Sequence, residues 1–143
     1  MKSTKPLKSN TDLNCACESG KLYTACCKIY HDGLNNGISA PTAEALMRSR
    51  YTAYTLDLEA YLLNTWHPET RPASLNLTTF DRHIFWLGLQ VKQFKTISEN
   101  EATVEFIARF KDNSQNGKAE RMREISQFLR IENAWFYVKA LPN

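Results

Sequence analysis

Four cysteine residues crowd into residues 15–27, and the rest of the 143-residue chain contains none. They form two close pairs, Cys15/Cys17 and Cys26/Cys27, joined by a short loop in which Gly20 allows the chain to turn back. Cysteines buried only for packing would have no reason to avoid the rest of the core. Four thiolates satisfy the tetrahedral preference of structural zinc. The cluster therefore predicts an N-terminal zinc knuckle with these four ligands.

Other uses of the cysteines fit the spacing less well. Disulfides within either pair would be strained, and disulfides between the pairs would need an oxidising compartment. A redox motif has two residues between its cysteines, which neither pair has. A free catalytic thiol is a further alternative. His31 follows Cys27 by four residues and could replace one cysteine as the fourth ligand.

Composition and charge narrow the class of protein. The hydrophobic fraction of 43% is typical of a globular chain, and the net charge of +3 is too small for a dedicated nucleic-acid binder, which leaves such binding as a disfavoured alternative. No segment approaches the ~18 consecutive apolar residues of a membrane span. Lys2, Lys5 and Lys8 are not followed by the apolar region of a signal peptide. We therefore expect a cytoplasmic protein with reduced thiols.

The cysteine segment resembles the SEC-C motif, the zinc-binding tail of the bacterial translocation motor SecA, which reads Cys-x-Cys-x(8)-Cys-Cys. The matching residues are Cys15, Cys17, Ser19, Gly20, Lys21, Tyr23, Cys26 and Cys27. Ala16 stands where the family usually has proline, and Glu18 where it has glycine, so the loop at residue 18 could differ. The resemblance implies bound zinc and, by analogy with SecA, a knuckle that docks a protein partner or the ribosome.

The remaining residues predict helices followed by strands. Apolar spacing and an N-cap at Thr42 predict a helix over 42–55, a second helix runs from Asp57 to Thr65, and a helical turn covers 75–82. Strands are predicted over 84–97, 102–111, 121–131 and 134–141. This order predicts an α+β fold with one curved antiparallel sheet wrapped over the helices. We assign residues 1–32 to a basic arm and the knuckle, and 33–143 to the α+β domain.

Three further segments are similar to the YchJ family: residues 41–51, residues 61–72, and Glu124-x-Ser126-x-Phe128 followed by Trp135-x-Tyr137. That family couples an N-terminal SEC-C motif to a domain resembling nuclear transport factor two, a cone of helices held in a curved sheet. The cone shape is what the resemblance implies, because the residue pattern alone supports only the α+β order. As far as the resemblance goes, the family has no established activity.

A pocket is predicted from the strand over 121–131, where Glu124, Ser126 and Phe128 share one face. If that face lines the helices, the carboxylate of Glu124 needs a cation, which Arg48 or Arg50 could supply. The residues proposed to line this pocket are Arg48, Tyr51, His67, Glu124 and Ser126. His67 would then act as a general acid or base. In the alternative interpretation, Arg48 and Glu124 form a structural ion pair and residues 66–68 are a rigid helix exit.

The preferred hypothesis is a zinc-binding adaptor or binding protein without catalysis, because a four-ligand metal site leaves no open position for substrate. No residue is assigned a catalytic role. A small-molecule binder or enzyme that uses the cone pocket is the alternative, and it rests on fold-level analogy.

Overall fold

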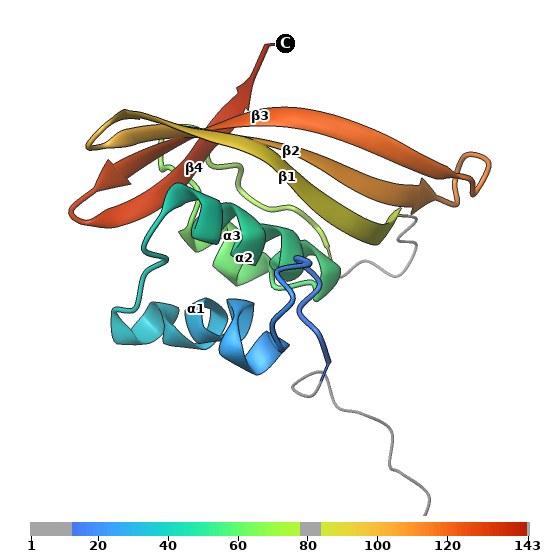
Figure 1. The fold of residues 1–143 in the computed structure, drawn as a ribbon, viewed down its shortest axis with the longest axis horizontal. Helices are drawn as coiled ribbons and strands as arrows, with labels where there is room; N and C mark the ends of the chain where they lie inside the picture. The colour runs from blue at the N-terminus through green and yellow to red at the C-terminus, as the bar shows by residue number, and fades with distance from the viewer. Residues whose placement is uncertain (1–12, 78–83, 143) are drawn as a thin grey trace, which may run out of the picture.

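A computed structural model describes residues 13–77 and 84–142, and it confirms the α+β class with three layers (Figure 1). A curved sheet forms the first layer, two helices pack beneath it, and a third helix lies on their far side. The helices are α1 (Cys27–Gly33), α2 (Ala43–Thr55) and α3 (Glu59–Asn64), with 3-10 turns at Tyr23–Ala25 and Leu34–Asn36. The strands are β1 (Ile84–Ser98), β2 (Glu101–Asp112), β3 (Ala119–Ile131) and β4 (Ala134–Leu141).

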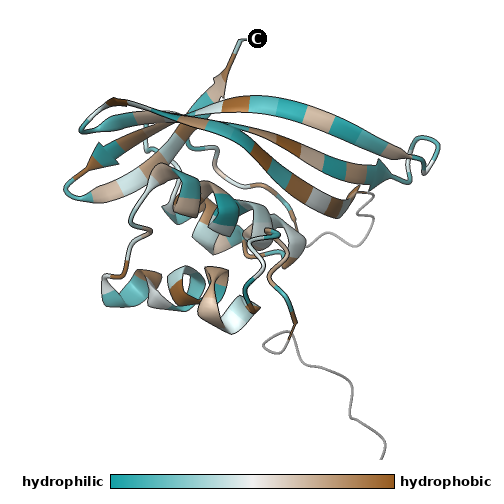
Figure 2. Cartoon of the chain, in the orientation of Figure 1, coloured by the Kyte–Doolittle hydropathy of each residue, from teal (hydrophilic) through white to brown (hydrophobic). Residues whose placement is uncertain are grey.

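The four strands form an antiparallel meander in the order β1-β2-β3-β4. Hydrophobic and hydrophilic residues alternate along parts of the strands (Figure 2). Successive side chains of a strand point to opposite faces, and one face of the sheet packs against α2. Val104, Ala108 and Phe128 on that face are almost completely buried. Glu132 and Asn133 both have positive φ, the conformation of a two-residue hairpin turn between β3 and β4.

Helix α2 lies at the centre of the molecule, covered by the sheet on one side and by α1 and the cysteine loop on the other (Figure 1). Thr42 caps its N-terminus as predicted, because the Thr42 hydroxyl accepts a hydrogen bond of 3.0 Å from the amide of Ala45. Buried residues occur all round this helix, including the polar Ser49, Arg50 and Thr52. A helix covered on two sides needs no exposed polar stripe, which explains this distribution.

Helix α1, which has no side-chain cap and packs on α2, has no counterpart in the sequence prediction. The predicted start of the second helix and the predicted helical turn also differ from the structure. Helix α3 begins at Glu59 rather than at Asp57, because Asp57 has a left-handed backbone with φ 59°. Residues 75–77 are not helical, and the remainder of the turn predicted over 75–82 lies outside the described residues. Within the described ranges, no helix is long and apolar enough to cross a membrane.

The chain leaving α3 pairs with the edge strand β4. The amide of His67 donates to the carbonyl of Tyr137 at 2.8 Å, and the amide of Tyr137 donates to the carbonyl of Thr65 at 2.9 Å. This pairing places the Trp66 ring edge-on against the Tyr137 ring, with 5.0 Å between the ring centroids. The exit of α3 is therefore fixed to the sheet by backbone hydrogen bonds.

Candidate metal centre and ligand pocket

The four cysteine thiols meet at one point. Their sulfur atoms all lie within 4.8 Å of one another, with Cys17 Sγ 3.6 Å from Cys26 Sγ and Cys26 Sγ 4.0 Å from Cys27 Sγ. Zinc–sulfur bonds of about 2.3 Å in a regular tetrahedron separate the sulfurs by about 3.8 Å. The donor set therefore fits one tetrahedral metal ion.

The thiols form hydrogen bonds with one another. Hydrogen bonds from the thiols of Cys17 and Cys27 lower the pKa of Cys15. The hydrogen bond to Cys15 raises the pKa of Cys27, and burial raises it further. Cys15, Cys17 and Cys27 are all buried, so several thiolates crowded here would repel one another without a cation. A metal ion bound by the four sulfurs would supply that cation.

The loop that carries the first cysteine pair is a tight hairpin. The amide of Cys15 donates to the carbonyl of Lys21 at 2.8 Å, and Asn14 bridges Leu22. Gly20 turns the chain back with a φ of 88°, a conformation that favours glycine. The 3-10 turn and α1 then bring the second pair, Cys26 and Cys27, alongside the first. These local turns explain why the thiols converge.

Arg48 fastens the cysteine loop to α2. Its Nη1 donates to the carbonyl of Cys17 at 2.7 Å, and its Nε pairs with Glu44 at 3.0 Å. The predicted ion pair between Arg48 and Glu124 is therefore wrong, and Arg48 is absent from the pocket lining. On the same side of α2, the hydroxyl of Thr52 lies 3.6 Å from the sulfur of Cys15. One face of α2 thus holds the cysteine cluster in place.

Glu18 joins the cysteine loop to the sheet. Its backbone adopts a φ of 61°, the conformation that a glycine would favour at this position. Its carboxylate accepts a 2.6 Å hydrogen bond from the amide of Leu89, beside a bulge in β1, and lies 3.7 Å from Arg109. A Cβ atom at Gly88 would lie 2.5 Å from this carboxylate, so the glycine permits the approach. The residue that departs from the SEC-C pattern thus forms a tether to β1.

His31 does not ligate the cluster. Its Nε2 bonds to the carbonyl of Ser49 at 2.8 Å, and its Nδ1 bonds to the hydroxyl of Tyr23 at 2.7 Å. A carbonyl only accepts, so Nε2 carries the proton and Nδ1 accepts from the tyrosine. Burial lowers the pKa of His31, which favours this neutral form. His31 therefore links α1 to α2.

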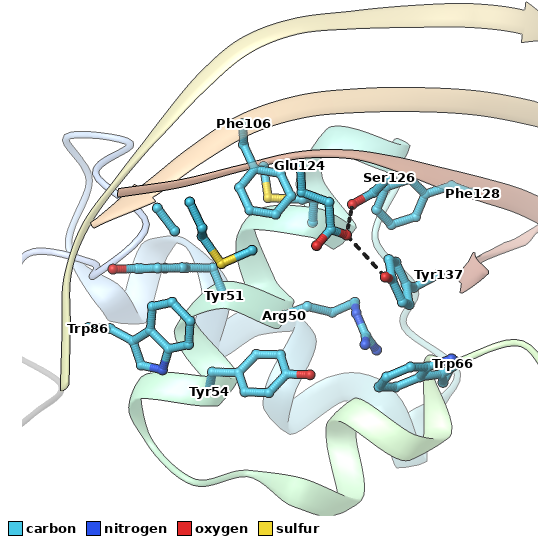
Figure 3. A pocket seen from close by; sticks show the side chains of 13 residues that line it. Arg50, Tyr51, Tyr54, Trp66, Trp86, Phe106, Glu124, Ser126, Phe128 and Tyr137 are labelled. Carbon is cyan, nitrogen blue, oxygen red and sulfur yellow. Dashed lines mark hydrogen bonds between the residues drawn. The ribbon is translucent and has the colours of Figure 1, made fainter. Parts of the chain in front are cut away.

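A pocket of about 260 Å³ lies between α2 and the inner face of the sheet (Figure 3). The lining residues are Met47, Arg50, Tyr51, Tyr54, Trp66, Trp86, Phe106, Ala108, Met122, Glu124, Ser126, Phe128 and Tyr137. Of the residues predicted from the sequence, Tyr51, Glu124 and Ser126 line this pocket, whereas Arg48 and His67 do not. His67 lies in the turn after α3, where its Nδ1 accepts from the amide of Glu69 at 3.1 Å. Its suggested acid–base role in the pocket therefore has no geometric basis.

Arg50 is the cation of the pocket. Arg50 is only 5% exposed. Its Nη1 donates hydrogen bonds to the carbonyl of Leu62 and to the hydroxyl of Thr65, each at 2.7 Å. Its guanidinium carbon lies 4.9 Å from the Trp66 ring centre and 4.7 Å from that of Tyr137. Burial lowers the pKa of Arg50 to about 10, so the group remains charged at neutral pH.

Helical spacing distinguishes Arg50 from Arg48. Residues two positions apart on an α-helix are separated by about 200° around its axis, so the side chains of Arg48 and Arg50 face opposite sides. Arg50 shares its side with Met47, Tyr51 and Tyr54, all of which line the pocket. The aromatic residues at these spacings were the sequence signal that identifies Arg50 as the residue facing the sheet.

The side chain of Glu124, on β3, points into the pocket (Figure 3). Its Oε2 accepts hydrogen bonds from the hydroxyl of Ser126 at 2.7 Å and from that of Tyr137 at 3.0 Å. Burial raises the pKa of Tyr137, and the charge of Glu124 raises it further, so the phenol stays protonated and donates. The pocket therefore combines one buried cation and one hydrogen-bonded carboxylate with aromatic walls.

The fold and the cysteine cluster define a class of protein, a cone-shaped domain with an N-terminal SEC-C motif. Residues 42–140 match the family described as "YchJ, middle NTF2-like domain". A UPF0225 protein of Chromobacterium violaceum is 48% identical over 143 residues, covering 99% of this chain and 98% of the relative. A UPF0225 protein of Bordetella pertussis is 45% identical, covering 87% of this chain and 89% of the relative. The chain belongs to this YchJ/UPF0225 family.

Two solved structures share the fold. A SEC-C motif containing protein from Rhodopseudomonas palustris is 34% identical and superposes with a TM-score of 0.74. The match covers 92% of this chain and 99% of that chain. A SEC-C motif containing protein from Psychrobacter arcticus is 29% identical and superposes with a TM-score of 0.77. The match covers 94% of this chain and 86% of that chain.

Proposed function

We propose that this chain is a zinc-stabilised protein that binds a small molecule in the pocket between α2 and the sheet. The observation that carries the proposal is Arg50, a buried and charged side chain in the wall of an apolar pocket. Burial of a charge is costly, and it is retained in proteins where the charge has a partner or a use. Within the described residues, no carboxylate hydrogen-bonds to Arg50, whose bonds go to a carbonyl and a hydroxyl, although the charge of Glu124 acts on it across the pocket.

In this proposal the metal has a structural role. Four thiolate ligands would complete the coordination of a zinc ion and leave no position for a substrate. The cysteines also belong to the main hydrophobic core, together with Leu46, Met47 and Tyr51 of α2. The ion would therefore hold the N-terminal segment against the domain, and the pocket would carry the activity.

Titration of the ¹⁵N-labelled protein with 3-phenylpropan-1-ol, a neutral probe of suitable size, tests pocket binding. We expect saturable shifts of the amide signals of Arg50, Tyr54 and Glu124. Little change is expected at Glu99, in the turn that joins β1 to β2. The pocket is smaller than the ~300–1,000 Å³ typical of sites for drug-sized ligands, so a small probe is appropriate. Shifts spread evenly over the surface, or no saturable shifts, would contradict the proposal.

A second candidate function is docking of a protein partner on the cysteine loop. Leu13 and Leu22 are 41% and 48% exposed, and they lie on neighbouring segments joined by the hydrogen bond between Tyr23 and Leu13. Lys21 is exposed next to them. An exposed apolar pair beside a cation favours a partner with an acidic and apolar surface.

Affinity capture from cell extract tests the docking candidate. We expect the wild-type chain to retain a protein that the Leu22→Asp variant loses, because an acidic residue would repel an acidic partner. The matched control is Phe94→Asp, which places the same charge on another exposed apolar position, 59% exposed and in β1. If both variants retain the same proteins as the wild type, the loop is not the docking surface.

A further inference from the structure

We infer that the pocket binds a small monocarboxylate with an apolar body, its carboxylate held by the Nε–H and Nη2–H groups of Arg50. This inference rests on the proposed function and specifies its ligand class. The argument depends on which donors of the buried guanidinium are used, on the charge of the opposite wall, and on the lining between them.

The guanidinium of Arg50 has unused donors. Both of its hydrogen bonds within the described residues come from Nη1, which donates to Leu62 and Thr65. Nε and Nη2 donate to no described residue, although a buried donor without a partner is costly. Among the described residues, Trp66 Nε1 is the fully buried side-chain donor without a partner, and both Trp66 and Arg50 line the pocket.

The free edge of the guanidinium matches a carboxylate. Nε–H and the neighbouring Nη2–H are parallel donors that pair with the two oxygens of one carboxylate in a bidentate arrangement. The fixed bonds from Nη1 and the flanking rings of Trp66 and Tyr137 hold the group in place before the ligand binds. A preorganised cation loses less entropy on binding than a mobile surface arginine.

The opposite wall restricts the charge of the ligand. Glu124 carries a second charge into the pocket, and Ser126 and Tyr137 partly compensate it by donating to its Oε2. With one cation and one carboxylate facing the same space, a dianion such as phosphate would be repelled more strongly than a monocarboxylate. A ligand charge of −1 therefore best matches a pocket that holds the cation of Arg50 and the partly compensated carboxylate of Glu124.

The rest of the lining is apolar and aromatic. Trp86 packs edge-on against Tyr51 with 5.8 Å between ring centroids, and Phe106 and Met47 also line the pocket. Such a wall favours an aliphatic or aromatic body over a polar one. The combination describes a small aryl or alkyl carboxylic acid.

Three probes of one size test the ligand class: 3-phenylpropionate, 3-phenylpropan-1-ol and 3-phenylpropylamine. They share the same body and differ in charge, and their Kd values are measured by NMR titration at neutral pH. We expect the acid to bind about tenfold or more tightly than the alcohol, as for one charge-assisted bidentate contact. The amine is expected to bind no better than the alcohol.

Variants assign the preference to Arg50. The Arg50→Met variant is expected to lose the advantage of the acid over the alcohol. Arg123→Met is the matched control, because Arg123 neighbours Glu124 on β3 but is half exposed and pairs with Glu105. If Arg50→Met does not fold, Glu124→Gln still tests the inference: removing the like charge should tighten binding of the acid about tenfold relative to the alcohol.

The outcomes separate the inference from the proposed function. Equal binding of acid and alcohol, or tightest binding of the amine, overturns the carboxylate assignment while pocket binding stands. An unchanged affinity of the acid relative to the alcohol in Glu124→Gln also overturns it. Failure of all three probes to bind overturns both.

Discussion

The Cys17→Ser variant is expected to lose its zinc and to melt about 10 °C below the wild type. The wild type is expected to contain one zinc ion per chain and no titratable thiol. Cys17 is completely buried, and its sulfur lies 3.6 Å from that of Cys26, so a serine hydroxyl cannot replace the thiolate at that position. Structural zinc contributes ~10–16 kcal/mol of binding free energy in zinc-finger peptides, and loss of about 3 kcal/mol of it suffices for this shift.

Metal analysis and calorimetry on the same sample check this result. The matched control is Ser19→Ala, which removes a hydroxyl 3.2 Å from Cys26 Sγ but no ligand. That variant should keep its zinc and melt within a few degrees of the wild type. Four titratable thiols and no metal in the freshly purified wild type would contradict the assignment of this site.

The Phe128→Ala variant is expected to lose about 3–5 kcal/mol of unfolding free energy. Phe128 is completely buried in β3, and its ring packs edge-on against Tyr137 at 5.8 Å. Truncation removes apolar contact area and leaves a cavity that the surrounding sheet cannot fill by moving. Tyr137 would also lose the ring that orients its hydroxyl toward Glu124, so ligand affinity should fall with stability.

Chemical denaturation measures this loss, with Phe94→Ala as the matched control. Phe94 is the same residue type in β1 but is 59% exposed, so its truncation should change the free energy of unfolding by less than about 1 kcal/mol. Equal losses for both variants would show that Phe128 does not contribute to the core as its burial indicates.

Local sequence patterns, namely the alternation along strands and the capping of helices, predicted most of the helices and strands. The strand predicted over 102–111 matches β2, where the alternation puts the buried Val104 and Ala108 on one face, and Thr42 marks the start of α2. These features depend on periodicity and capping, which act over a few residues. The meeting of the four thiols likewise follows from two close pairs that a short hairpin turn separates.

The features that sequence reasoning missed depend on contacts between distant segments. Helix α1 has no side-chain cap that a sequence pattern could reveal. It packs on α2, and that contact stabilises it. Arg48 was placed in the pocket, although its partner is the carbonyl of Cys17, 31 residues away in the chain. Glu18 was noted only as a departure from a glycine pattern, and its bond to Leu89 spans 71 residues. A single sequence carries little signal for such pairs.

Helix α2 is shared by the two sites, and this has a thermodynamic consequence. Arg48 and Thr52 fix one side of the helix to the cysteine cluster, and Arg50 presents the other side to the pocket. An ion that restrains the helix lowers the entropy that a pocket ligand must remove, and by reciprocity the ligand must raise the affinity for the ion by the same factor. If both sites are occupied as proposed, their occupancy would be positively cooperative. A ligand screen on metal-depleted protein would then underestimate the affinities it measured.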